Sequence, residues 1–178
     1  WYMGETLMAA LERADTGAID GGGPARFPVQ WVNRPNLNFR GYSGTLAAGS
    51  LAPGDEVVVL PSARISRIER IVTHGGDLDI AGTGDAVSLT LTDDIDVSRG
   101  DVIASAEGRP ETSDQFQVHL IWMQDEQLLP GRSYLMKTAN QIVTASISEL
   151  KYKINVNNQV HEAAKVLELN EIGICNIS

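Results

Sequence analysis

Residues 26–49 read RFPVQWVNRPNLNFRGYSGTLAAG, and this stretch decides the fold class. Phe27, Val29 and Trp31 recur at every second position, which is the period of side chains along a β-strand. The Asn-Arg-Pro-Asn run at 33–36 is typical of a turn, and the β pattern continues with small residues over Tyr42–Ala48. The stretch therefore predicts two strands joined by a turn.

The same pattern of short β-strands and turns continues to the end of the chain. Short apolar segments rich in β-branched residues alternate with Gly, Pro and Asp turns. The expected strands are Glu56–Leu60, Ile65–Val72 with a bulge, Ala86–Leu91, Val102–Ala104, Phe116–Met123, Ser133–Thr138, Ile142–Tyr152 and Gly173–Ile177. Residues 160–165 fit either a strand or a short helix. Many short strands of this kind predict an all-β protein of two tandem small antiparallel β-barrels.

A short N-terminal helix is expected before the barrels, over residues 4–14. Leu7, Met8 and Leu11 fall on one helical face, Glu5 is expected in the first turn, and Gly17 suits a stop signal.

The expected organisation is a linker helix over residues 1–23, a barrel domain over 24–111 and a second barrel over 112–178. The start at Trp1 suggests a cut inside a longer sequence. The stop just after the last strand suggests that the second barrel lacks closing strands.

Composition limits the possible partners and compartments. The net charge is −9, which argues against nucleic acid as a partner, because phosphate-backbone binding needs clustered Lys and Arg. The longest apolar run falls short of the ~18 residues that cross a bilayer, and the N-terminus has no secretory pattern, so no membrane partner is expected. The single cysteine, Cys175, is expected to be a buried structural thiol in a cytoplasmic protein.

A search for chemistry yields no catalytic, cofactor-binding or metal-binding residue. The sequence contains neither the Gly-Lys pair of a phosphate-binding P-loop nor the Asn-Lys pair of a guanine-reading motif. Residues 82–85 are expected to form a hairpin turn. Residues 93–96 could hold a cation, although a solvated turn is favoured. Arg64, Arg67 and Arg70 form a basic row. It is either a solvated face balanced by Glu69, which is favoured, or a contact for an acidic partner or a nucleic acid.

The block Arg26–Gly49 resembles the second domain of translation-factor GTPases. More narrowly, it is similar to the GTP-hydrolysing large subunit of bacterial sulfate adenylyltransferase, including forms fused to adenylylsulfate kinase. The matching residues are Arg26–Gln30 and Asn33–Asn36, with further similarity in Leu91–Asp101 and in Leu169–Gly173. The resemblance covers nearly the whole chain.

This resemblance implies a coupling role rather than an active site. In the family, a preceding domain binds GTP and Mg, and a separate small catalytic subunit transfers the adenylyl group of ATP to sulfate. The implied partners are that small subunit and the protein's own GTP-binding domain, and no cofactor is expected within these residues.

Four residues occupy the signature loop and are the candidate partner contacts: Arg34, Asn36, Phe39 and Arg40. A purely structural role for them is the other interpretation and is favoured. Gly41 and Gly44 are expected to supply backbone conformations that are closed to other residues.

Two other functions are weighed. The chain could be the β-domains of a translation factor that carries aminoacyl-tRNA, although the acidic balance opposes this. It could also be a self-standing β-barrel enzyme with a small-molecule site between the barrels.

Overall fold

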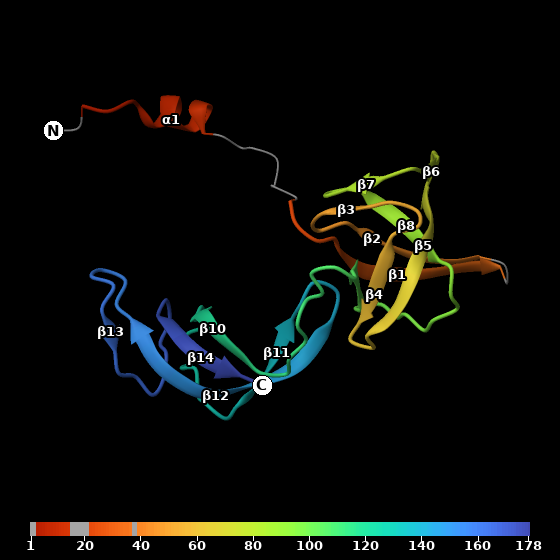
Figure 1. The fold of residues 1–178 in the computed structure, drawn as a ribbon. Helices are drawn as coiled ribbons and strands as arrows, with labels where there is room; N and C mark the ends of the chain where they lie inside the picture. The colour runs from red at the N-terminus through yellow and green to blue at the C-terminus, as the bar shows by residue number, and fades with distance from the viewer. Residues whose placement is uncertain (1–2, 15–21, 37–38) are drawn as a thin grey trace.

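The computed structural model describes residues 3–14, 22–36 and 39–178. Apart from one short helix, the regular structure of these residues is antiparallel β, as the sequence predicts. Figure 1 shows two β-rich bodies that follow each other along the chain, with the helix at the N-terminal end standing apart from both. The domain limits at residues 24–111 and 112–178 stay a prediction.

Helix α1 (Leu7–Arg13) is shorter than predicted because Thr6 caps it. The Thr6 hydroxyl accepts a hydrogen bond from the amide of Ala9 at 3.2 Å, as N-cap residues do. Glu5 therefore precedes the cap, so its predicted place in the first turn is wrong. No residue of α1 is buried, and Gly17 lies outside the described residues. Among the described segments, no helix has the length and apolarity to cross a membrane.

The first body is built on a seven-stranded sheet in the order β4-β9-β1-β2-β8-β5-β6. Its strands are β1 (Arg26–Asn36), β2 (Phe39–Thr45), β4 (Glu56–Leu60), β5 (Arg64–Thr73), β6 (Gly76–Leu78), β8 (Ala86–Leu91) and β9 (Val102–Ser105). Because β4 also pairs with β5, the pairings run in a ring through β4, β9, β1, β2, β8 and β5. A two-stranded sheet joins β3 (Ser50–Leu51) to β7 (Ala81–Gly82).

The first hairpin differs from the sequence prediction. Strand β1 continues to Asn36, which pairs with Phe39, so the predicted turn at Asn33–Asn36 is wrong. Pro35 is tolerated in the strand because the β1–β2 register is already irregular between Asn33 and Asn36, where the missing proline N–H breaks no regular ladder. The bulge predicted in the fifth strand is confirmed by a register shift between Ile68 and Arg70.

One turn design recurs three times in the first body. In residues 52–55, 82–85 and 98–101, the closing Asp carboxylate accepts from the amide three residues earlier at 2.8–2.9 Å. The glycine before each Asp has a φ of 94–99°, which side chains rarely adopt. Residues 82–85 nevertheless do not close a hairpin, because β7 pairs with β3 and β8 pairs with β2 and β5.

The core of the first body follows from the alternation seen in the sequence. Phe27 and Val29 of β1 are fully buried, whereas Trp31, beyond a β-bulge, is 63% exposed. Tyr42 and Leu89 face each other across β2 and β8 and are also buried. Each such side chain stabilises the fold by about 1.5–3 kcal/mol.

The second body is a five-stranded sheet with the order β10-β14-β12-β11 and β13 beside β12. Its strands are β10 (Phe116–Ile121), β11 (Ser133–Lys137), β12 (Ile142–Ile154), β13 (His161–Glu162) and β14 (Ile172–Ile177). In the described chain, no strand pairing joins β10 to β11. Residues 160–165, left open between strand and helix, contribute only the short strand β13.

The two bodies touch where residues 140–141 meet strand β1 and the turn at residues 98–101. The Asn140 side-chain amide donates to the carbonyl oxygen of Val29 at 3.1 Å, and the same oxygen accepts from the Gly100 amide at 2.9 Å. Gly100 lies so close to Gln141 that an added Cβ would come within 2.0 Å of the Gln141 Nε2 atom. Gly100 thus leaves room for the Gln141 side chain at this contact.

Candidate functional site

All four residues of the signature loop line one hollow at the end of the first hairpin. We call it the strand-tip hollow, and its volume is about 630 Å³. It is lined by Arg34, Asn36, Phe39, Arg40, Tyr42, Glu69, Arg70, Thr90, Leu91, Thr92, Asp93 and Asp94. The structure therefore brings together residues from β1, β2, β5, β8 and the loop after β8.

Strand geometry explains how Arg40 enters the hollow. Arg40 and Tyr42 are two residues apart on β2, so their side chains share one face. The Arg40 guanidinium lies over the Tyr42 ring, 5.9 Å from its centroid. Tyr42 is 1% exposed and forms the floor beneath the arginine.

The nearby glycines act through space rather than through backbone conformation. Neither Gly41 nor Gly44 has a positive φ, so that prediction is wrong. A Cβ on Gly44 would lie 2.4 Å from the carbonyl oxygen of Pro28, and one on Gly41 would lie 2.7 Å from the Phe39 ring. The Phe39 ring thus packs directly against the backbone of Gly41.

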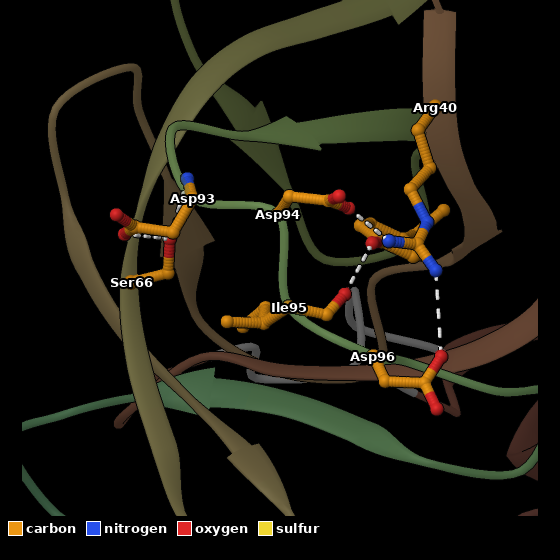
Figure 2. A network of polar contacts seen from close by, with 7 residues as sticks. Arg40, Ser66, Asp93, Asp94, Ile95 and Asp96 are labelled. Atoms are coloured by element: carbon orange, nitrogen blue, oxygen red, sulfur yellow. Dashed lines mark hydrogen bonds and ion pairs between the residues drawn. The ribbon is translucent and has the colours of Figure 1, made fainter. Parts of the chain in front are cut away.

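Arg40 ties the loop after β8 to strand β2. Figure 2 shows the Asp94 and Asp96 carboxylates turned toward its guanidinium, with the Arg40 Nη2 to Asp96 Oδ1 distance at 3.4 Å. The Tyr42 hydroxyl donates to the carbonyl oxygen of Ile95 at 3.1 Å. On the other side, the Ser66 hydroxyl donates to Asp93 at 2.7 Å. Burial raises the pKa of Tyr42, which keeps its hydroxyl protonated as a donor.

Two buried hydrogen-bond donors of residues in the strand-tip hollow have no partner among the described residues. They are the Nε atom of Arg40 and the hydroxyl of Thr90, a residue that is 5% exposed. Buried polar groups without partners are uncommon and call for an explanation. Arg34, at the exposed rim, makes no ion pair with a described residue.

Two residues of the basic row have ion-pair partners. Arg67 pairs with Glu56 and Arg70 pairs with Asp77. Asp77 raises the pKa of Arg70, and the nearby charge of Glu69 raises it further, in keeping with the predicted balance. Residues 93–96 are held by Ser66 and Arg40, and the described residues contain no group of three side chains that could hold a metal ion.

Cys175 is buried, as predicted. Burial raises the pKa of its thiol, which disfavours the reactive thiolate.

Sequence reasoning did not find the partners of Arg40. Asp94 and Asp96 lie 54 and 56 residues further along the chain, and Thr90 carries no motif. Only the pairing of β2 with β8 brings these residues beside Arg40. The cluster of Asp93, Asp94 and Asp96 is apparent in the sequence, but no neighbouring residue in the sequence indicates that it pairs with an arginine.

Comparison with known proteins identifies the relatives of this chain. It is 52% identical over 178 residues to the bifunctional enzyme NodQ of Rhizobium sp. (strain N33), 46% to the bifunctional enzyme CysN/CysC of Xylella fastidiosa, and 44% to sulfate adenylyltransferase subunit 1 of Aliivibrio fischeri. Each match covers the whole of this chain. The chain is homologous over its whole length to part of sulfate adenylyltransferase subunit 1 and of these bifunctional enzymes. It spans 28%, 29% and 37% of the lengths of these three relatives, respectively.

Three further matches agree with this fold. Residues 115–178 match the model of the GTP-eEF1A C-terminal domain-like family. Among solved structures, Sup35 complexed with GDP has a TM-score of 0.79 at 18% identity over the whole chain and 44% of that protein. The elongation factor SelB of Methanococcus maripaludis has a TM-score of 0.71 at 20% identity, over 95% of this chain and 38% of that protein. The fold is therefore that of the β-domains of translation-factor GTPases.

Proposed function

We propose that this chain is the coupling part of a sulfate adenylyltransferase large subunit. It would transmit the state of a GTP-binding domain to a small catalytic subunit that transfers the adenylyl group of ATP to sulfate. The observation that carries this proposal is the 44–52% identity, over all 178 residues, to subunit 1 and the bifunctional relatives. Such a protein would work in the cytoplasm.

The two β-rich bodies suit a transmitting role. A switch that responds to a nucleotide needs parts that keep their shape while they move. The ring of strand pairings in the first body and the contact of Asn140 with Val29 provide such parts. Transmission also needs a partner that binds one state more tightly than the other.

The proposal places GTP and Mg in a separate domain of the large subunit. A triphosphate is held by a Gly-rich loop with a Lys, and this sequence contains no Gly-Lys pair. The contribution of these residues would be contact with partners, with Arg34, Asn36, Phe39 and Arg40 as the candidate contacts.

A nucleotide titration tests this division of labour. A fluorescent GTP analogue with Mg, titrated into the purified 178 residues, should give no saturable signal. A full-length relative such as the Aliivibrio subunit 1 is the positive control. Tight binding of GTP to the 178 residues would contradict the proposal.

The alternative of aminoacyl-tRNA binding has the weaker support. The matches to Sup35 and SelB stand at 18–20% identity and speak for the fold alone. The net charge of −9 also disfavours a polyphosphate partner. Salt-sensitive binding of tRNA at physiological ionic strength would favour this alternative.

A further inference from the structure

We propose that the strand-tip hollow is a docking point for a carboxylate on an acidic segment of a protein partner. The partner carboxylate would bind Arg34 at the rim and take the place of Asp94 on Arg40. This inference rests on the proposed function in one respect, namely that the chain docks on another protein.

The first argument is the supply of free donors. Arg40 and Thr90 both line the hollow, and the buried Nε atom of Arg40 and the buried Thr90 hydroxyl have no acceptor among the described residues. Folded proteins satisfy nearly all of their buried donors. A ligand rich in oxygen acceptors would supply what these two groups lack.

The second argument is that Arg34, which has no ion pair with a described residue, lies beside Arg40, which has two. Arg34 lines the same hollow, is exposed and has no ion pair with a described residue. Its charge reaches into the site, because Arg34 lowers the pKa of Tyr42 and thereby opposes the dominant effect of burial. A carboxylate that entered here would meet two guanidinium groups, which form strong charge-assisted hydrogen bonds.

The third argument is that the present partners of Arg40 are replaceable. The Arg40 side chain is 24% exposed, whereas those of Asp94 and Asp96 are 89% and 90% exposed. Ion pairs this open to water contribute little, because solvent competes for both charges. The two aspartates also show that the Arg40 guanidinium is placed to take carboxylates. They act as occupants that a partner carboxylate can displace.

The charge around the hollow selects a protein rather than a nucleic acid. Glu69, Asp93 and Asp94 line it together with the arginines, and the chain carries a net charge of −9. A run of phosphates would meet these carboxylates as well as the arginines. A single Asp or Glu side chain needs only the local guanidinium groups.

The direct test is titration of the 178-residue chain with capped peptides that each contain one glutamate among neutral residues. The same peptides with glutamine in its place are the ligand control. Arg34→Gln should weaken binding by about tenfold, since hydrogen bonds between charged groups contribute on that scale. Arg64→Gln is the matched control, because Arg64 is likewise exposed and unpaired but lies outside the hollow, and it should leave affinity unchanged.

Thr90→Val is the second variant, and it should weaken peptide binding while the fold stays intact by circular dichroism. Equal binding of the glutamine peptides, equal loss in the Arg64 variant, or tighter binding of inorganic phosphate or oligothymidine would each overturn the proposal.

A final arm separates this inference from the proposed function. The small subunit of sulfate adenylyltransferase should bind the wild-type chain and bind Arg34→Gln more weakly. Equal binding to both chains would refute the docking point and leave the proposed function standing. Failure to bind either chain would refute the proposed function, whatever the peptide result.

Discussion

At the scale of single residues, the strand-tip hollow keeps groups that do not serve stability. Thr90 places a hydroxyl where the structure gives it no acceptor, although the site is 95% buried. The Phe39 ring packs against Gly41, where a side chain would collide with the ring. These features are what a binding surface needs and what a core designed only for stability would avoid.

Thr90→Val should therefore stabilise the chain. Valine has nearly the same shape, and the change removes a buried donor without a partner, which is worth about 1 kcal/mol. Urea unfolding monitored by circular dichroism measures the free energy of unfolding. Thr73→Val is the control, because the Thr73 hydroxyl donates to Gly76 at 2.7 Å and its loss should destabilise. A destabilised Thr90→Val protein would show that the hydroxyl has a partner.

At the scale of strands and turns, alternation and turn chemistry predicted most of the fold. Strands β4, β5 and β8 were placed within a residue or two, because each is an apolar β-branched run between turn residues. The turn at residues 82–85 was also predicted, although it does not close the hairpin expected there.

What escaped prediction depends on neighbours distant in sequence. The need for Gly44 comes from Pro28, and the role of Asp94 comes from Arg40. No local pattern records such pairs.

Gly44→Ala should weaken the β1–β2 pair. The added methyl group would lie 2.4 Å from the carbonyl oxygen of Pro28, and overpacking of this kind typically costs about 1–3 kcal/mol. Gly82→Ala, in strand β7, is the matched control because an added Cβ there would lie 3.9 Å from the nearest atom, Asp85 Oδ2. Chemical unfolding of both variants checks the difference. Equal free energies of unfolding for the two variants would mean that strands β1 and β2 accommodate the added methyl group without loss of stability.

The hydrogen bond between Lys153 of β12 and Glu171, which directly precedes β14, should make the free energy of unfolding depend on pH. Lys153 donates to Glu171 at 2.5 Å, and this hydrogen bond holds the pKa of the Glu171 carboxyl below its ordinary value. A carboxyl with a lowered folded-state pKa stabilises the fold above its unfolded pKa of about 4.3, and this stabilisation is lost as the pH falls through the folded-state value.

Lys153→Met should consequently be less stable than wild type at pH 6. The difference between the two should shrink below pH 4, as Glu171 becomes protonated in the wild type. Urea unfolding at both pH values measures this. A difference that stays constant with pH would show that the Lys153–Glu171 pair does not set it.

At the scale of the whole molecule, coupling requires that the two β-rich bodies keep their relative position. Their contact rests on Asn140 at Val29 and on the close approach of Gln141 to Gly100. A Cβ at position 100 would force the Gln141 side chain out of its place on Gly100.

Gly100→Ala should separate the bodies without unfolding either. Small-angle scattering should show a larger radius of gyration than for wild type, while circular dichroism stays unchanged. Gly84→Ala is the control, since Gly84 has a similar φ of 95° but no neighbour within 4 Å. It therefore carries the same backbone strain without the collision. Equal radii for the two variants would assign no role to this contact.

The central claim is that this chain transmits the state of a nucleotide and does not sense the nucleotide itself. Calorimetric titration of the sulfate adenylyltransferase small subunit into the 178-residue chain, with and without Mg and GTP, tests it most directly. The account predicts a saturable complex whose affinity is the same in both conditions. No complex, or an affinity that changes when GTP is added in the absence of a GTP-binding domain, would contradict it.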